Sequence, residues 1–261
     1  MKDTRTKRKI LHSSLCRKVD LHIPERWEQL TQEELREVLR LYTLLGEKGM
    51  DSVKTAFLCR ANIMTVIRKT DIGWLCSIGK DKFILNTELL PDIFSHMEWM
   101  DRPEQMTDRL QHIGQYEARD MWLRTLPFGH YLMLENFYQA FLTSEDATLL
   151  LRMARLLYNV PDDAKDFQPE PYELNATFMW YTAVKKRFAE EFPNFLKSVN
   201  GQETGTAASQ KEIMNAQIRI LTKGDITKND AILKSDTWSA LLELDALAKE
   251  AEEFKNKMKK K

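Results

Sequence analysis

The stretch that decides how the chain is organised is Asn200-Gly-Gln-Glu-Thr-Gly-Thr-Ala-Ala208, directly followed by Ser209-Gln-Lys-Glu212. The first segment is short, polar and contains two glycines, which is typical of a linker. The second has the spacing of a helix capping box, in which a serine hydroxyl and a glutamate three residues later satisfy each other's exposed backbone amides. A helix start directly after a linker predicts a boundary at 200–208 and a separate C-terminal helical block at 209–261.

The C-terminal block is predicted to contain three helices. The first ends at Lys223-Gly-Asp225, because glycine readily takes the left-handed conformation at a helix end. A short second helix is expected over 227–233, and a third starts after Ser235 or Asp236 as its cap. The third helix carries one apolar stripe, formed by Trp238, Leu241, Leu244, Ala248, Ala251 and Phe254.

A block of about fifty residues buries only a modest core, so we expect it to dock onto another surface. Two interpretations are open: the block packs on the main domain of its own chain, or it binds a separate protein from a flexible tether. In the second case Trp238 is the expected anchor, because large aromatic side chains dominate interface energies. The candidate partner-binding residues are Trp238, Leu241, Leu244, Ala248 and Phe254.

Residues 23–199 are predicted to form a predominantly helical main domain. A capping box at Thr31-Gln-Glu-Glu34 starts a helix that runs to about residue 45. The proline-rich segment 161–171 is predicted to be a surface loop. Further helices are expected over 51–68, 89–94, 108–124, 130–142, 145–158 and 173–199, the last with a kink or restart at Pro193.

One segment of the main domain has a different pattern. Trp74-Leu-Cys-Ser-Ile78 and Phe83-Ile-Leu85 are short apolar runs on either side of Gly79-Lys-Asp-Lys82. This pattern predicts a small β-hairpin near 74–85, which must lie on helices because two strands alone are only marginally stable. The expected fold class is therefore predominantly all-α, with an irregular helical main domain, one hairpin and a C-terminal three-helix block.

Composition narrows the function classes. Lysine plus arginine equals aspartate plus glutamate at 39 each, so no strong overall field attracts nucleic acid or an anionic membrane. The basic segment 1–22 is predicted to be a flexible arm, because it has little apolar content before Ile10. No signal peptide is expected, since no apolar core follows the basic start. Three cysteines without paired spacing predict free thiols and a cytoplasmic location. No membrane span is expected.

Chemical motifs point away from an enzyme. The sequence lacks HExxH, GxGxxG, CxxC, GxSxG and the phosphate-binding GxxxxGK pattern. The carboxylate pair Glu117 and Asp120 is expected on a solvated helix surface beside Arg119. The five histidines are scattered and are predicted to be surface or capping side chains. We therefore expect a non-enzymatic protein with no catalytic, cofactor-binding or metal-binding residues.

A DNA-associated protein is the alternative. Basic residues gather at 2–9 and 255–261, and the predicted helix, turn and helix over 213–233 have the order of a helix-turn-helix unit. The second helix of that unit, 228–234, is short and mixed in charge, whereas a helix that reads bases is usually basic or rich in amides. Nucleic-acid binding is for this reason the second expectation.

Five short stretches carry a family resemblance: Lys223-Gly-Asp225, Asp236-Thr-Trp238, Leu241-Leu-Glu-Leu-Asp245, Pro24-Glu-Arg-Trp27 and Leu30-Thr31. They resemble small helical proteins encoded in phage and prophage tail modules. The resemblance implies a tail assembly chaperone-like role, in which a helical protein holds a longer structural partner, such as a tape measure, until the tube polymerises around it. It brings no catalytic residues, and the middle region 72–200 has no counterpart in it.

Overall fold

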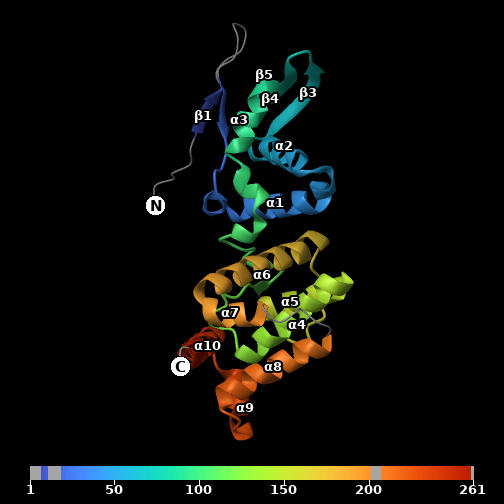
Figure 1. The fold of residues 1–261 in the computed structure, drawn as a ribbon. Helices are drawn as coiled ribbons and strands as arrows, with labels where there is room; N and C mark the ends of the chain where they lie inside the picture. Colours follow the sequence, from blue (N-terminus) through green and yellow to red (C-terminus); the bar gives the residue numbers. More distant parts are fainter. Residues whose placement is uncertain (1–6, 11–18, 201–206, 260–261) are drawn as a thin grey trace. The chain divides into compact units, whose positions relative to one another are not determined.

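The computed structural model describes residues 7–10, 19–200 and 207–259 and is predominantly helical (Figure 1). The chain divides into two compact units. Unit 1 comprises Met1–Leu110 and Pro171–Ala176, and unit 2 comprises Gln111–Glu170 and Thr177–Lys261. Helix α6 (Pro171–Glu191) therefore gives its first residues to unit 1 and the rest to unit 2.

This division differs from the predicted one. The predicted main domain 23–199 contributes to both units, and the predicted C-terminal block 209–261 belongs to unit 2 together with residues of the middle region. Most of the predicted linker 200–208 lies outside the described residues. A linker composition marks where the chain leaves a helix, but it carries no information about which surfaces then meet.

Unit 1 begins with two antiparallel strands, β1 (Lys7–Ile10) and β2 (Val19–His22). Lys7 pairs with His22 and Ile10 pairs with Val19. The prediction of a flexible arm over 1–22 did not include this pairing. The remaining residues of that segment, 1–6 and 11–18, lie outside the part of the chain that the structure describes.

The predicted capping box forms at the start of α1 (Gln32–Leu45). The Glu34 amide donates to Thr31 Oγ1 at 3.2 Å, and the Thr31 amide donates to Glu34 Oε2 at 2.8 Å. Helix α2 (Met50–Ala61) follows, and the two helices pack together through buried aliphatic and aromatic side chains. Short 3-10 turns of unit 1 lie at Trp27–Gln29, Gly46–Lys48, Thr87–Leu89, Glu98–Asp101 and Pro103–Gln105.

A three-stranded antiparallel sheet follows α2, with the order β3 (Met64–Thr70), β4 (Gly73–Ile78) and β5 (Asp81–Asn86). The predicted hairpin is β4 and β5, and α3 (Leu90–Ser95) comes after it. The predicted helix over 51–68 is wrong beyond Ala61. Its second half contains the β-branched run 65–67, which favours a strand once β4 is available as a partner.

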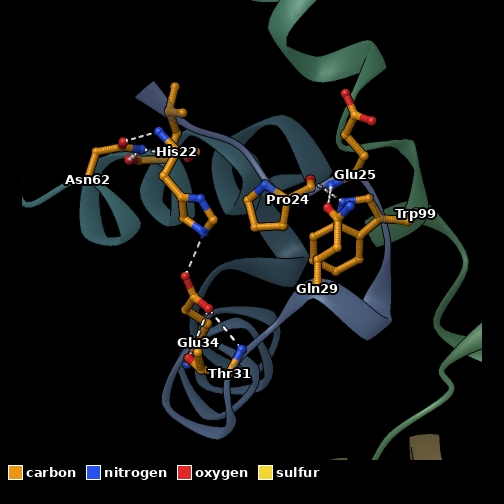
Figure 2. A network of polar contacts seen from close by, with 9 residues as sticks. His22, Pro24, Glu25, Gln29, Thr31, Glu34, Asn62 and Trp99 are labelled. Carbon is orange, nitrogen blue, oxygen red and sulfur yellow. Dashed lines mark hydrogen bonds and ion pairs between the residues drawn. The ribbon is translucent and has the colours of Figure 1, made fainter. Parts of the chain in front are cut away.

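The connection between β2 and α1 is held by a polar network (Figure 2). The His22 amide donates to Asn62 Oδ1 at 2.6 Å, and Asn62 Nδ2 donates back to the His22 carbonyl at 3.0 Å. His22 Nε2 lies 2.8 Å from Glu34 Oε1. Further along, the buried indole of Trp99 donates to the Pro24 carbonyl at 2.8 Å. These contacts satisfy backbone groups of an irregular segment and fix its path over the core.

The first elements of unit 2 are strands and not the predicted helix. The predicted helix over 108–124 is wrong, because the structure forms two short paired strands there, β6 (His112–Ile113) and β7 (Tyr116–Glu117). Gly114 between them has a φ of 56°, a left-handed conformation that turns the chain. The partial helical period of the apolar residues in this stretch reflects their burial, and Glu117 and Asp120 do not share a helix face.

The rest of unit 2 is helical: α4 (Phe128–Ser144) and α5 (Ala147–Leu157) form the predicted helical hairpin, followed by α6 and α7 (Pro193–Asn200). The predicted restart at Pro193 is confirmed, and 161–170 forms the predicted loop. The last three helices are α8 (Ala207–Thr222), α9 (Asn229–Lys234) and α10 (Thr237–Lys259). Helices α8 and α9 pack against α4, and α10 packs mainly against α7.

Candidate partner-binding surface

The start of α10 is joined to the start of α4 by backbone pairing. The amide and hydroxyl of Thr237 both donate to the Leu126 carbonyl, at 2.8 and 2.7 Å. The Phe128 amide donates to the Ser235 carbonyl at 2.8 Å. Thr237 and Leu126 are fully buried, so these hydrogen bonds are shielded from water. They fix the position of the first residue of α10 within unit 2.

Asp236 supplies the predicted cap of α10. Its Oδ1 accepts a hydrogen bond from the Ser239 amide at 2.8 Å, and this bond holds the pKa of Asp236 below its usual value. The prediction that Ser235 or Asp236 caps this helix is confirmed for Asp236. An ionised carboxylate at this position also suits the positive end of the helix dipole.

The middle of α10 is fixed to α7 by Asp245. Its Oδ1 accepts from the backbone amides of Asn194 and Phe195, at 2.7 and 2.9 Å. Its Oδ2 accepts from Asn194 Nδ2 at 2.8 Å. A side chain of one helix thus caps the first turn of another, which sets the position of α10 along α7.

Two of the five predicted partner-binding residues are buried in unit 2, and a third packs against its aromatic side chains. Leu241 and Leu244 are 0% and 2% exposed. Trp238 is half-buried, and its ring meets Phe192 and Phe188 edge to face with centroids 5.0 and 6.0 Å apart. These side chains are used inside the chain, as the first interpretation of the C-terminal block expects.

The other two predicted residues lie further along α10. Ala248 is half-buried, and Phe254 is 65% exposed. Every residue from 251 to 258 is exposed, so the helix extends beyond the side chains that cover its first half. Met258, one turn after Phe254, is 62% exposed.

The apolar residues of α10 follow a regular seam that the predicted set captured only in part. The seam alternates steps of four and three residues, the spacing of a coiled-coil contact, and consists of Ala240, Leu244, Leu247, Ala251, Phe254 and Met258. Ala240 and Leu244 are buried, whereas the seam from Leu247 onwards runs from half-buried to exposed. We call the residues Leu247, Ala251, Phe254 and Met258 the distal seam. The alternating spacing was the sequence signal for Leu247 and Met258.

Charges along α10 are separated by sign. Residues 243–253 carry five carboxylates and one lysine, whereas residues 255–259 carry three lysines and no carboxylate. Glu250 and Lys257 each precede a seam residue and are exposed on the same flank of the distal seam. The surface is therefore an apolar row with an acidic first part and a basic second part.

The second helix of the predicted DNA-binding unit corresponds to α9, which is packed within unit 2. Gly224 ends the turn after α8 with a φ of 82°, as predicted for this glycine. Helix α9 then packs against α4, and a Cβ atom built on Gly129 would lie 3.2 Å from the Leu233 carbonyl oxygen. One side of α9 is thus used for packing within unit 2.

The predicted carboxylate pair Glu117 and Asp120 does not lie on a helix. Glu117 is exposed on β7, and Asp120 Oδ1 accepts from the Trp122 amide at 3.1 Å. Within residues 7–10, 19–200 and 207–259, no three His, Cys, Asp or Glu side chains are grouped as metal ligands would be. Over the same residues, no helix combines the length and apolar character needed to cross a membrane. What the distal seam offers chemically is an apolar contact with charged flanks.

No protein-family model, no curated protein and no solved structure matches the chain.

Proposed function

We propose that this chain is a non-enzymatic interaction protein and that the distal seam of α10 is its contact surface. The observation that carries the proposal is the continuation of one apolar seam from the buried half of α10 onto a half where residues 251–258 are all exposed. A row of apolar residues on one face of a helix is a common mode of recognition, in which the row lies in a groove or beside a second helix.

Burial of the distal seam by a partner would be energetically favourable. Full burial of a phenylalanine or methionine side chain contributes roughly 1.5–3 kcal/mol each, and Phe254 and Met258 leave most of this unused in the isolated chain. The first half of the helix is also already held in place by Asp236, Thr237 and Asp245. A partner therefore does not have to supply the free energy of fixing this half of α10, which lowers the cost of binding.

The partner class follows from the resemblance to tail-module proteins. We propose a helical segment of a tail structural protein, which this chain would hold in the cytoplasm as an assembly chaperone until the tail tube forms. An apolar helix surface with charged flanks suits that role, because it covers an aggregation-prone segment through reversible contacts. The proposed contact does not use Leu241 and Leu244, which are buried, or Trp238, whose ring packs on Phe188 and Phe192.

Co-expression with the tail structural proteins encoded in the same genome tests the proposal. We expect the chain to recover such a partner in soluble form, and Phe254→Glu or Met258→Glu to abolish the recovery. The matched control is Leu242→Glu, because Leu242 is 59% exposed on the same helix but lies more than about 100° around the helix from every residue of the distal seam. Equal recovery by all four proteins, or none by the unmodified chain, would contradict the proposal.

A further inference from the structure

We infer that the distal seam also pairs with the distal seam of a second copy of this chain, in antiparallel orientation. This inference uses the same surface as the proposed function but does not depend on a tail partner. It is carried by two independent properties of α10: the sizes of the seam side chains and the positions of the charges beside them.

The side-chain sizes match when the seam is reversed onto itself. A two-fold axis midway between Ala251 and Phe254 places the Ala251 of each copy opposite the Phe254 of the other. The same axis places Leu247 opposite Met258. A small residue thus faces a large one at the centre, and two side chains of similar volume face each other at either end, which is how well-packed helix pairs fill space.

The charges match in the same arrangement. In an antiparallel pair the same flank of each helix faces the other, so the exposed Glu250 of one copy faces the exposed Lys257 of the second. The symmetry produces this contact twice. Lys255 and Lys257 of each copy would also lie beside the acidic segment 243–253 of the other.

A parallel pair loses the match of side-chain sizes. Ala251 would face Ala251 and leave a gap, while Phe254 would face Phe254 in the next layer. The charges do not distinguish the two orientations, because in a parallel pair Glu250 of one copy would face Lys255 of the other. The sizes of the seam side chains therefore favour antiparallel pairing.

The extent of the contact sets its strength. The distal seam spans twelve residues of helix, about 18 Å at 1.5 Å per residue. Such a contact is below the size of a standard stable interface, so a weak and rapidly reversible dimer is expected. A weak dimer would cover the distal seam in the absence of a tail partner and uncover it on dilution or when a stronger partner competes.

Sedimentation velocity of the full chain tests the dimer, over a roughly hundredfold range of concentration that includes the micromolar region. We expect the unmodified chain and the control Leu242→Glu to shift from monomer to dimer as concentration rises. Phe254→Glu is expected to weaken the dimer at least about tenfold, because it places a charge in the seam of each copy. Phe254 is exposed in the folded chain, so we expect its replacement not to unfold the protein. An unchanged circular dichroism melting curve verifies that a weaker dimer is not caused by unfolding. A monomer at every concentration, or equal dimerisation of Phe254→Glu, would overturn the inference.

Charge exchange tests the orientation. Glu250→Lys and Lys257→Glu are each expected to weaken the dimer roughly three- to tenfold, and the double variant is expected to restore it. A parallel dimer does not bring Glu250 and Lys257 together, so loss without restoration would rule out the antiparallel arrangement. Failure of the inference is separable from failure of the proposed function: a chain that stays monomeric but recovers a tail protein through Phe254 supports only the function, and a dimer that recovers none supports only the inference.

Discussion

The carboxylate of Asp245 on α10 accepts a hydrogen bond from the backbone amide of Phe195 in the first turn of α7, at 2.9 Å. The residue before α7 is Phe192, whose side chain has no acceptor to offer the free amides of that turn. Asp245 therefore does for α7 what a serine or aspartate normally does from within the same segment. The cap of one helix and the docking of another are the same interaction.

We expect Asp245→Ala to lower the free energy of unfolding of unit 2 by about 1–2 kcal/mol, since the amides of Asn194 and Phe195 lose their acceptor. Chemical denaturation followed by tryptophan fluorescence measures the effect. Glu243→Ala is the control, because Glu243 is an exposed carboxylate on the same helix. Equal effects of the two substitutions would show that the cap contributes nothing beyond a surface charge.

Gly73→Ala is expected to disrupt the sheet of unit 1. Gly73 has a φ of 157°, and a Cβ atom there would lie 2.1 Å from the Leu85 carbonyl oxygen of the neighbouring strand. We expect a loss of at least about 3 kcal/mol in thermal or chemical unfolding. Gly79→Ala is the matched control: its φ is 58° but no atom lies within 4 Å of the new methyl, so only about 1–2 kcal/mol of backbone strain is expected. A comparable cost at both glycines would contradict the close approach.

Lys54 and Asp101 form an ion pair in unit 1 with Nζ and Oδ2 2.7 Å apart. Lys54 is only 5% exposed, so removal of its partner leaves a buried charge unpaired. We expect Asp101→Ala to cost about 1–3 kcal/mol of stability, and Lys54→Met to cost less because it removes the charge and keeps the volume. Adding Lys54→Met to Asp101→Ala should then recover stability in denaturant titrations. A double variant less stable than Asp101→Ala alone would argue against a charge effect.

His130 gives unit 2 a specific dependence on pH. Burial lowers the pKa of His130, the charge of Arg119 lowers it further, and Asp162 opposes the shift. The unfolded chain therefore takes up this proton at a higher pH than the folded chain does, so its contribution to stability is complete above about pH 6.5 and is lost as the pH falls below it.

The test compares the free energy of unfolding at pH 7.5 and pH 5.5 for the unmodified chain and for His130→Gln. We expect the variant to lose less stability across this interval, because glutamine does not titrate. Carboxylates with lowered pKa values, such as Asp236, contribute only in more acidic solution and do not confuse the comparison. Identical losses in the two proteins would rule out a role for His130 in acid sensitivity.

The sequence predicted the features that depend on neighbouring residues, namely helix caps, turns and helix breaks. The capping box at Thr31, the turn at Gly79 and the break at Pro193 all lie where the sequence indicates. Strand β3 was missed because its identity depends on pairing with β4, whereas its residues also fit a helical period. The turn at Gly114 likewise replaced an expected helix, since burial of its flanking residues mimics a helical stripe.

For the candidate surface, the sequence indicates that α10 is amphipathic but not where its packing ends. The packing of α10 involves Asp245, which binds the start of α7 about fifty residues earlier in the chain, and this contact has no local signature in the sequence. The predicted set therefore combined buried Leu241 and Leu244 with exposed Phe254. A search for alternating steps of three and four residues would have added Leu247 and Met258.

The pairing of Leu126 with Thr237 also constrains how the protein is made. The two residues are 111 positions apart, and in unit 1 the side chains of Thr43 and Asn175 that meet are 132 positions apart. During translation, most of either unit therefore leaves the ribosome well before the residues that complete it. Long loops of this kind slow folding, because their closure entropy is lost before the contact rewards it. Until α10 has been synthesised, the side chains of Phe188 and Phe192 lack their contacts with Trp238. We therefore expect the synthesis rate and nascent-chain binding factors to govern the yield of this protein.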